Sequence, residues 1–112
     1  MRRIQKVSYK FNEDLIATDG IDKNEFEKTI KETFAKYGLT KRTKAGNYIA
    51  PDREKDYYFN FGKALLDLGE YKWVTTYLSE LYWYVDGVKE DVLKSMRQIE
   101  KYGIEQAVRM GV

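Results

Sequence analysis

The stretch from Ile21 to Ile49 constrains the fold most, because it reads as the middle of a β-α-β unit. Asp22 stands where a helix N-cap is expected, and Glu25 follows three residues later, as in a capping box. Apolar residues then recur at helical spacing, namely Phe26, Ile30, Phe34 and Tyr37. Gly38 comes next, where a left-handed C-cap is expected. This pattern predicts a helix that ends at Gly38 and leads through a basic turn into a strand.

The segments on either side of this helix predict two strands. Polar and apolar residues alternate in Arg3–Phe11, which is typical of a strand. One face would carry Val7, Tyr9 and Phe11, and the other Lys6, Ser8 and Lys10. The polar segment Asn12–Gly20 is predicted to be a loop, and the second strand is expected at about Lys44–Ala50. A connection as long as a helix favours a parallel or crossover pairing of these strands over a hairpin.

The second half of the chain continues the alternation of helices and strands. A second helix is expected over Asp52–Gly69, where Tyr58, Phe61, Leu65 and Leu68 recur at helical spacing. The next segment fits a helix through Trp73, Tyr77, Leu81 and Val85, and it also alternates as a strand. The high β-propensity of residues 81–85 favours a split into a helical turn up to about Leu78 and a strand over Glu80–Val85.

The last part of the sequence predicts a third helix. Its apolar residues are Val88, Val92, Met96 and Ile99, it closes at Gly103, and a short helical tail follows at Ile104–Met110. The resulting order is β-α-β-α-β-α. We therefore expect a single α+β domain over residues 1–112, with a ferredoxin-like arrangement of helices packed on a small sheet.

Composition narrows the possible functions. The chain has 112 residues, with 20 basic and 18 acidic side chains, so no strong field points to a polyanionic partner. It has no cysteine and no histidine, which excludes disulfides, thiolate metal sites and the commonest general base. The absence of cysteine favours a cytoplasmic protein. No apolar run reaches the roughly 20 residues of a membrane-spanning helix, so no membrane partner is expected.

Aromatic residues are unusually frequent. Ten Tyr, five Phe and two Trp exceed what one small core requires. Some of these rings are therefore expected at a subunit interface or on a stacking surface. On this basis we expect a homodimer formed through the sheet edge or the aromatic strand.

From Asn24 to Met96 the chain resembles the virulence-associated protein D (VapD) family of small ferredoxin-like proteins. The resemblance rests on a helix that ends in Gly38-Leu39, a glycine-containing second strand and the helix end Lys63–Leu68. It continues with Trp73, then Glu80-Leu81, Tyr84, Asp91 and the last helix. The fold of that family is related to the small subunit of the CRISPR integrase. The resemblance implies a homodimeric endoribonuclease from toxin–antitoxin or mobile-element contexts.

The family's functional residues carry over only in part. The Asp that ends the family's first strand falls on Lys10 here, and its paired arginines fall on Ser79 and Tyr82. Its glutamine before the strand glycine falls on Ala45. Each replacement removes a group that would hold metal, phosphate or RNA.

Acidic residues supply the candidate catalytic site. Glu13, Asp14 and Asp19 follow the first strand, where carboxylates could hold Mg²⁺ against a phosphodiester. Asp14 and Asp86 are the candidate catalytic residues, with Asp86 joining a site shared across a dimer axis, and Glu13 and Asp14 are the candidate metal ligands. The alternatives are a solvated loop at Glu13–Asp19 and an Asp86-Gly87 pair that caps the next helix.

Basic and aromatic residues supply the candidate nucleic-acid or partner surface. Lys10, Lys41, Arg42 and Lys44, with Arg2, Arg3 and Lys6, could line one edge of the sheet beside stacking tyrosines. They could equally be a solvated face that guards an edge strand. Tyr82, Trp83 and Tyr84 place aromatics on both faces of one strand, as either core plus dimer contact or core plus binding surface.

Two functional classes follow. The first is a binding module that kept the frame, lost the nuclease centre and acts on a nucleoprotein or protein partner, for example as an inhibitor of a host defence system. The second is a VapD-like, metal-dependent endoribonuclease with displaced carboxylates, which would use Mg²⁺ as its cofactor. The lost Asp and arginines favour the binding module.

Overall fold

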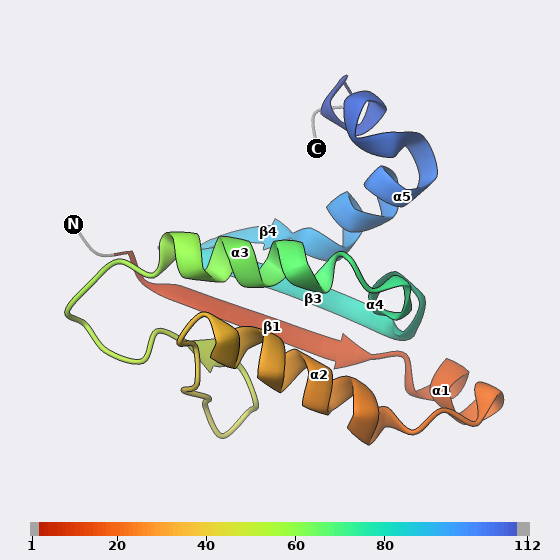
Figure 1. Cartoon of the computed structure of the whole chain (residues 1–112), viewed down its shortest axis with the longest axis horizontal. Coiled ribbons are helices and arrows are strands. Elements are labelled where there is room, and N and C mark those ends of the chain that lie inside the picture. Colours follow the sequence, from red (N-terminus) through yellow and green to blue (C-terminus); the bar gives the residue numbers. More distant parts are fainter. Residues whose placement is uncertain (1–2, 110–112) are drawn as a thin grey trace.

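The computed structural model describes the backbone of residues 3–109 and the side chains of residues 3–103. Its elements are β1 (Gln5–Phe11), α1 (Glu13–Asp19), α2 (Lys23–Lys36), β2 (Tyr48–Ile49), α3 (Tyr58–Leu68), α4 (Lys72–Tyr77), β3 (Leu78–Val85), β4 (Val88–Asp91) and α5 (Val92–Arg109). Within the described residues the strands form one antiparallel sheet in the order β2-β1-β3-β4, and the helices pack against it (Figure 1). The predicted α+β class is confirmed.

Helix α2 begins and ends as its sequence predicts. The Asp22 side chain accepts a hydrogen bond from the Asn24 amide at 3.0 Å, which satisfies one of the free N–H groups at the helix start. Gly38 has φ of 78°, and the Leu39 amide donates to the Phe34 carbonyl at 2.9 Å. This is the Schellman ending, in which the left-handed residue is nearly always glycine because it has no Cβ.

Strand β1 lies in the centre of the sheet and is amphipathic. Val7 pairs with Tyr48 of β2 on one side and with Trp83 of β3 on the other. Along β1, Val7 and Phe11 are buried, whereas the alternate residues are partly or fully exposed. The predicted two faces of this strand are therefore confirmed.

The prediction for the second strand was wrong in both pairing and length. The strand covers only Tyr48–Ile49 instead of Lys44–Ala50, and it runs antiparallel to β1. The cause is a chain reversal in the basic turn, where the Gly46 amide donates to the Thr43 carbonyl at 2.9 Å. After this turn Tyr48 bridges back to Arg42, so the segment after α2 is a small hairpin.

A fourth strand replaces the predicted start of the last helix. Val88–Asp91 pairs with β3 through the two-residue turn Asp86-Gly87, whose φ angles are 50° and 83°. Both central residues of a type I′ turn need positive φ, and Asp-Gly is a favoured pair there. The alternative that Asp86 caps the next helix was thus wrong. Asp91 does this instead, because its side chain accepts from the Lys94 amide at 3.0 Å.

Four other segments are compared here with their predictions, and the split of Trp73–Val85 is the one that matches in full. The predicted loop after β1 is instead helix α1, which Asn12 caps by accepting from the Leu15 amide. Helix α3 begins at Tyr58 and not at Asp52. The split of the Trp73–Val85 segment into a helical turn and a strand is confirmed by α4 and β3. Helix α5 runs to Arg109 with a kink at Gly103, and the predicted tail residue Met110 lies outside the described residues.

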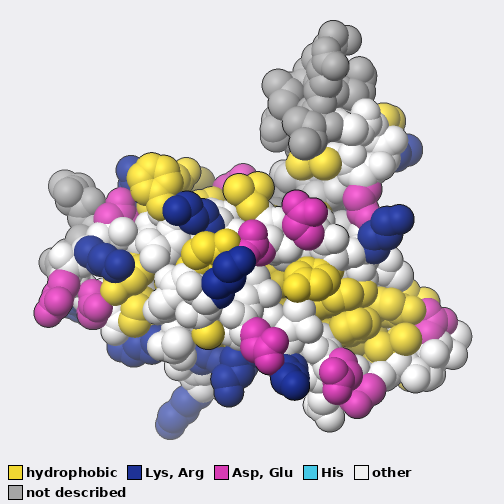
Figure 2. Space-filling view, in the orientation of Figure 1, with side chains coloured by type: hydrophobic (Ala, Val, Ile, Leu, Met, Phe, Trp, Pro, Cys, Tyr) yellow, Lys and Arg dark blue, Asp and Glu magenta, His cyan; other side chains and the backbone are white. Residues whose placement is uncertain are grey.

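Aromatic rings fill much of the core between the sheet and helices α2 and α3. Phe34 is fully buried, and its ring stacks on Tyr48 with 4.3 Å between centroids. Near α4, Phe26 stacks on Trp73 at 4.2 Å. Hydrophobic side chains also reach the surface over α3 and where α2 meets α4 (Figure 2). Among the described residues, no helix combines the length and apolar character that a membrane span requires.

Candidate nucleic-acid interface

The helices cover one face of the sheet and leave the other face uncovered. We call the uncovered face the open face. Buried residues of the central strands all point toward the helices, and the alternate residues keep part of their surface exposed. By strand alternation and register, the open face carries Lys6, Ser8, Lys10, Ile49, Glu80, Tyr82, Tyr84, Lys89 and Asp91. Two tyrosines and three lysines therefore meet on one surface that no core packing requires.

Pairing across three strands brings lysines onto these tyrosines. Tyr84 of β3 pairs with Lys6 of β1 and with Lys89 of β4, so the three form one row. The Lys6 ammonium lies 4.4 Å from the Tyr84 ring centroid, and the Lys89 ammonium lies 3.9 Å from the ring centroid of Tyr82. The two tyrosine rings are 6.4 Å apart at 60°. Each ring thus has one lysine ammonium over it, and both tyrosines are half-buried.

This arrangement suits a ligand that offers both flat rings and negative charge. Unpaired bases stack on aromatic side chains, and lysines beside them neutralise phosphates. A lysine over a ring gains about 0.5–1 kcal/mol at exposed sites, so a phosphate can draw it away at small cost. Lys10 lies farther along the same face, where it pairs with Glu80 at 3.4 Å. On the open face, Tyr82 and Tyr84 are therefore the rings that a base could stack on.

Trp83, predicted with its neighbours as a contact residue, does not reach the open face. Its side chain points to the helices and is 8% exposed. Its indole N–H donates to the side-chain oxygen of the buried Gln5 at 3.0 Å. Tyr82 and Tyr84 are thus the part of the predicted aromatic set that the structure brings to the surface.

In the basic turn after α2, Arg42 has a structural role and the two lysines are exposed. The Arg42 guanidinium donates to the Gly46 carbonyl at 2.8 Å and to the Tyr9 hydroxyl at 3.0 Å, and so holds the hairpin closed. Burial raises the pKa of the Tyr9 phenol, and the nearby Arg42 charge opposes this shift. Lys41 and Lys44 are exposed on the same hairpin. Of the other predicted basic residues, Arg3 pairs with Asp56 at 3.7 Å, and Arg2 lies outside the described residues.

The candidate acids do not gather within one chain. Glu13 pairs with Lys23 at 3.0 Å, and Asp14 stands beside it in the first turn of α1. Asp19 accepts from the Tyr77 hydroxyl at 2.8 Å. Asp86 instead accepts from the Ile4 amide at 2.7 Å, before β1 begins. Within the part of the chain that the structure describes, no three acidic side chains are grouped to hold a metal ion.

The length of β1 sets the separation of the two candidate catalytic residues. Asp14 follows this strand and Asp86 lies at its start, and the strand has 7 residues. At about 3.3 Å per residue, the two acids are roughly 20 Å apart. A shared metal between Asp14 and Asp86 would therefore require a second copy of the chain.

Lys89 is a site residue that the sequence pattern does not predict. The helical spacing of Val88, Val92 and Met96 predicts a helix there, so Lys89 is not expected on the sheet. The signal that could have found it is Asp86-Gly87, a strong hairpin dipeptide between apolar segments.

Comparison of the chain with protein-family models, with curated proteins and with solved structures finds no match.

Proposed function

We propose that this protein is a binding module without catalytic activity that takes single-stranded RNA, free or within a nucleoprotein, on its open face. The observation that carries this proposal is the tyrosine pair Tyr82 and Tyr84 with lysines over both rings. Both rings keep part of their surface accessible on the face of the sheet that the helices leave uncovered. The cytoplasmic setting, the mobile-element context and the action against a host defence system remain part of this proposal.

The finer fold assignment, ferredoxin-like and similar to the VapD family, is also a proposal. It is supported by the antiparallel bridge between Arg42 and Tyr48. When the two sides of this hairpin are counted as two strands, the order of elements along the chain is β-α-β-β-α-β, and the additional strand β4 follows. In such an arrangement the sheet has helices on one side only, which leaves an open face for a ligand.

The endoribonuclease alternative receives less support from the geometry. The acids that would hold Mg²⁺ are spread over both ends of β1, and Glu13 is already paired with Lys23. We expect purified protein with Mg²⁺ or Mn²⁺ to leave single-stranded RNA intact. Metal-dependent cutting that Asp14→Ala or Asp86→Ala abolishes, in protein that remains folded, would contradict the binding-module proposal.

The RNA proposal is tested by fluorescence anisotropy with a labelled, unstructured oligoribonucleotide. Base stacking on an aromatic side chain is worth about 1–3 kcal/mol, so Tyr82→Ala with Tyr84→Ala should weaken binding by at least about tenfold. Lys6→Ala with Lys89→Ala should reduce the salt dependence of binding. The matched controls are Tyr71→Ala and the pair Lys28→Ala with Lys31→Ala, which change exposed residues of the same types on helices or their ends.

Two results would overturn the RNA proposal. One is wild-type protein that does not bind the oligoribonucleotide at low salt. The other is an affinity that the tyrosine substitutions leave unchanged while circular dichroism shows the fold intact. A change from dimer to monomer in the tyrosine variant, without RNA binding by the wild type, would instead assign the open face to contact between copies.

A further inference from the structure

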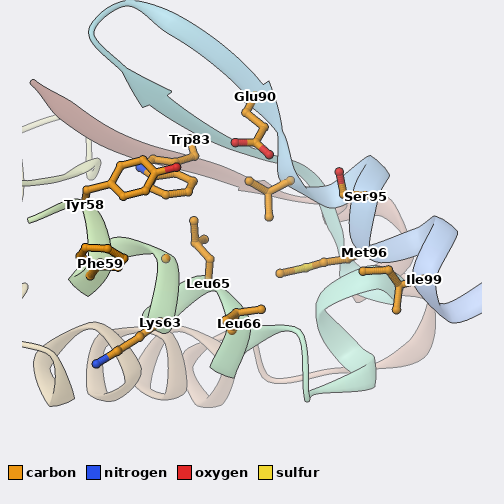
Figure 3. Close-up of a pocket in the computed structure, with 12 residues that line it drawn as sticks. Tyr58, Phe59, Lys63, Leu65, Leu66, Trp83, Glu90, Ser95, Met96 and Ile99 are labelled. Atoms are coloured by element: carbon orange, nitrogen blue, oxygen red, sulfur yellow. The ribbon is translucent and has the colours of Figure 1, made fainter. Parts of the chain in front are cut away.

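A second surface lies on the opposite side of the sheet from the open face. It is a groove of about 520 Å³ between α3 and the segment that runs from β4 into α5 (Figure 3). Trp83 of β3 lines it next to Tyr58. Leu65 and Leu66 come from α3, and Met96 and Ile99 come from α5. We call it the α3–α5 groove. Its residues play no part in the proposed RNA contact.

The groove leaves large apolar side chains in solvent. Phe59 and Leu66 both belong to α3, and they are 76% and 74% exposed. Ile99 of α5, which also lines the groove, is exposed as well. Phe59, Leu66 and Ile99 all line the same groove, so their exposed apolar surfaces lie close together. Exposed apolar side chains that gather in one place, unlike scattered ones, commonly mark an interaction site.

The chain itself carries a segment of suitable chemistry for this groove. Helix α5 continues past Ile99, and Gly103 with φ of 81° sharply redirects it. Figure 1 shows the end of α5 lying away from α2 and α3. By sequence, Ile104–Arg109 contains three apolar residues at the helical spacing i, i+3 and i+4. A short helix with this pattern gains stability when its apolar residues are covered.

We propose that the α3–α5 groove of one copy receives the segment after Gly103 of a second copy, and that the exchange is reciprocal. The lengths agree: Phe59 to Leu66 spans roughly 10 Å along α3, and six helical residues span about 9 Å. The charges agree as well. Lys63 and Glu90 lie on opposite sides of the groove, and the segment carries one acid and one base, Glu105 and Arg109.

This arrangement goes beyond the proposed function and is compatible with it. A reciprocal exchange is an isologous contact, so it closes at two copies and does not form a filament. Because the groove and the open face lie on opposite sides of the sheet, both open faces would remain available. It also uses a different surface from the sheet edge or aromatic strand that the sequence suggested for a dimer.

The test is the mass of the full chain in solution, measured by sedimentation equilibrium over a range of concentrations. The wild type is expected to be a dimer. Leu66→Glu places a charge in the groove without burying it in the monomer, and it should weaken self-association by about a hundredfold or more. Truncation after Gly103 should have the same effect. Val88→Glu, at an exposed apolar residue outside the groove, is the matched control and should leave the dimer unchanged.

Mixing the two defective chains separates this exchange from any other dimer. Leu66→Glu chains keep the segment, and truncated chains keep the groove, so the mixture should form a heterodimer with one intact contact although neither chain dimerises alone. A monomeric wild type would overturn the proposal. So would a dimer that survives both changes, or two monomeric variants that fail to associate when mixed. RNA binding is measured separately, so failure here would leave the proposed function untouched.

Discussion

Replacement of Phe34 by alanine is expected to lower the free energy of unfolding by about 3–5 kcal/mol, the usual cost of removing a buried ring from a packed core. Phe34 has no exposed surface, it stacks on Tyr48 at 4.3 Å, and it meets Phe61 edge-on at 6.3 Å. Both neighbours are held by other elements and cannot close the cavity fully. Urea denaturation followed by circular dichroism measures the change.

Phe59→Ala is the matched control for this substitution. It makes the same chemical change on α3, but the ring is 76% exposed, so the free energy of unfolding should change by less than about 0.5 kcal/mol in dilute, monomeric protein. Equal losses for the two variants would contradict the placement of Phe34 in the core.

The second large effect is expected for Trp83→Ala, at about 3–5 kcal/mol of unfolding free energy. The substitution removes a ring that packs against the Tyr58 ring with 5.0 Å between centroids. It also leaves the Gln5 side-chain oxygen without its indole donor. Thermal and urea unfolding both report this loss. The sequence alone leaves open which face of this strand is core, so it does not predict this loss.

Tyr82→Ala provides the control for Trp83→Ala, because the two residues are adjacent and point to opposite faces of β3. Its effect on stability should be below about 1 kcal/mol, although it should impair RNA binding. A stable Trp83→Ala protein, or a Tyr82→Ala protein that unfolds, would reverse the assignment of the two faces.

The sequence predicts those elements whose ends carry local chemistry. Asp22 and Gly38 mark α2 because an N-cap and a left-handed C-cap act through their own side chains and backbone. The alternation in β1 is equally local, since one face must be buried. In contrast, α1 is too short to show a periodic apolar face, and the polar residues after Asn12 therefore suggested a loop.

The missing strand β4 shows how a helical pattern can mislead. Val88, Val92 and Met96 recur at helical spacing, yet Asp86-Gly87 turns the chain back onto β3 before the helix begins. The prediction that a helix begins at Asp52 was wrong for a similar reason. The side chains of Asp52 and Asp56 accept from the Glu54 and Tyr58 amides, and these hydrogen bonds stabilise turns in place of a helix.

The sequence predicts which types of residue form the candidate site, but not which of them contact one another. Tyr82 and Tyr84 could be expected to share a face from their spacing in a strand. Their lysine partners depend on register with strands far away in the sequence, which no local pattern specifies. The α3–α5 groove depends on the angle at which α5 leaves the sheet, so it could not be predicted either.

The central place of β1 also bears on how the protein is made. Gln5 in this strand bonds to Trp83, 78 residues later in the chain. Ribosomes add about 5–20 residues per second, so the first strand waits roughly 4–16 seconds for its main neighbour to be synthesised. Contacts this distant in sequence also slow folding after release. A nascent chain stopped before β3 would therefore expose both hydrogen-bonding and apolar surface of β1. It would not fold into a smaller stable domain, and chaperones and proteases would recognise it as unfolded.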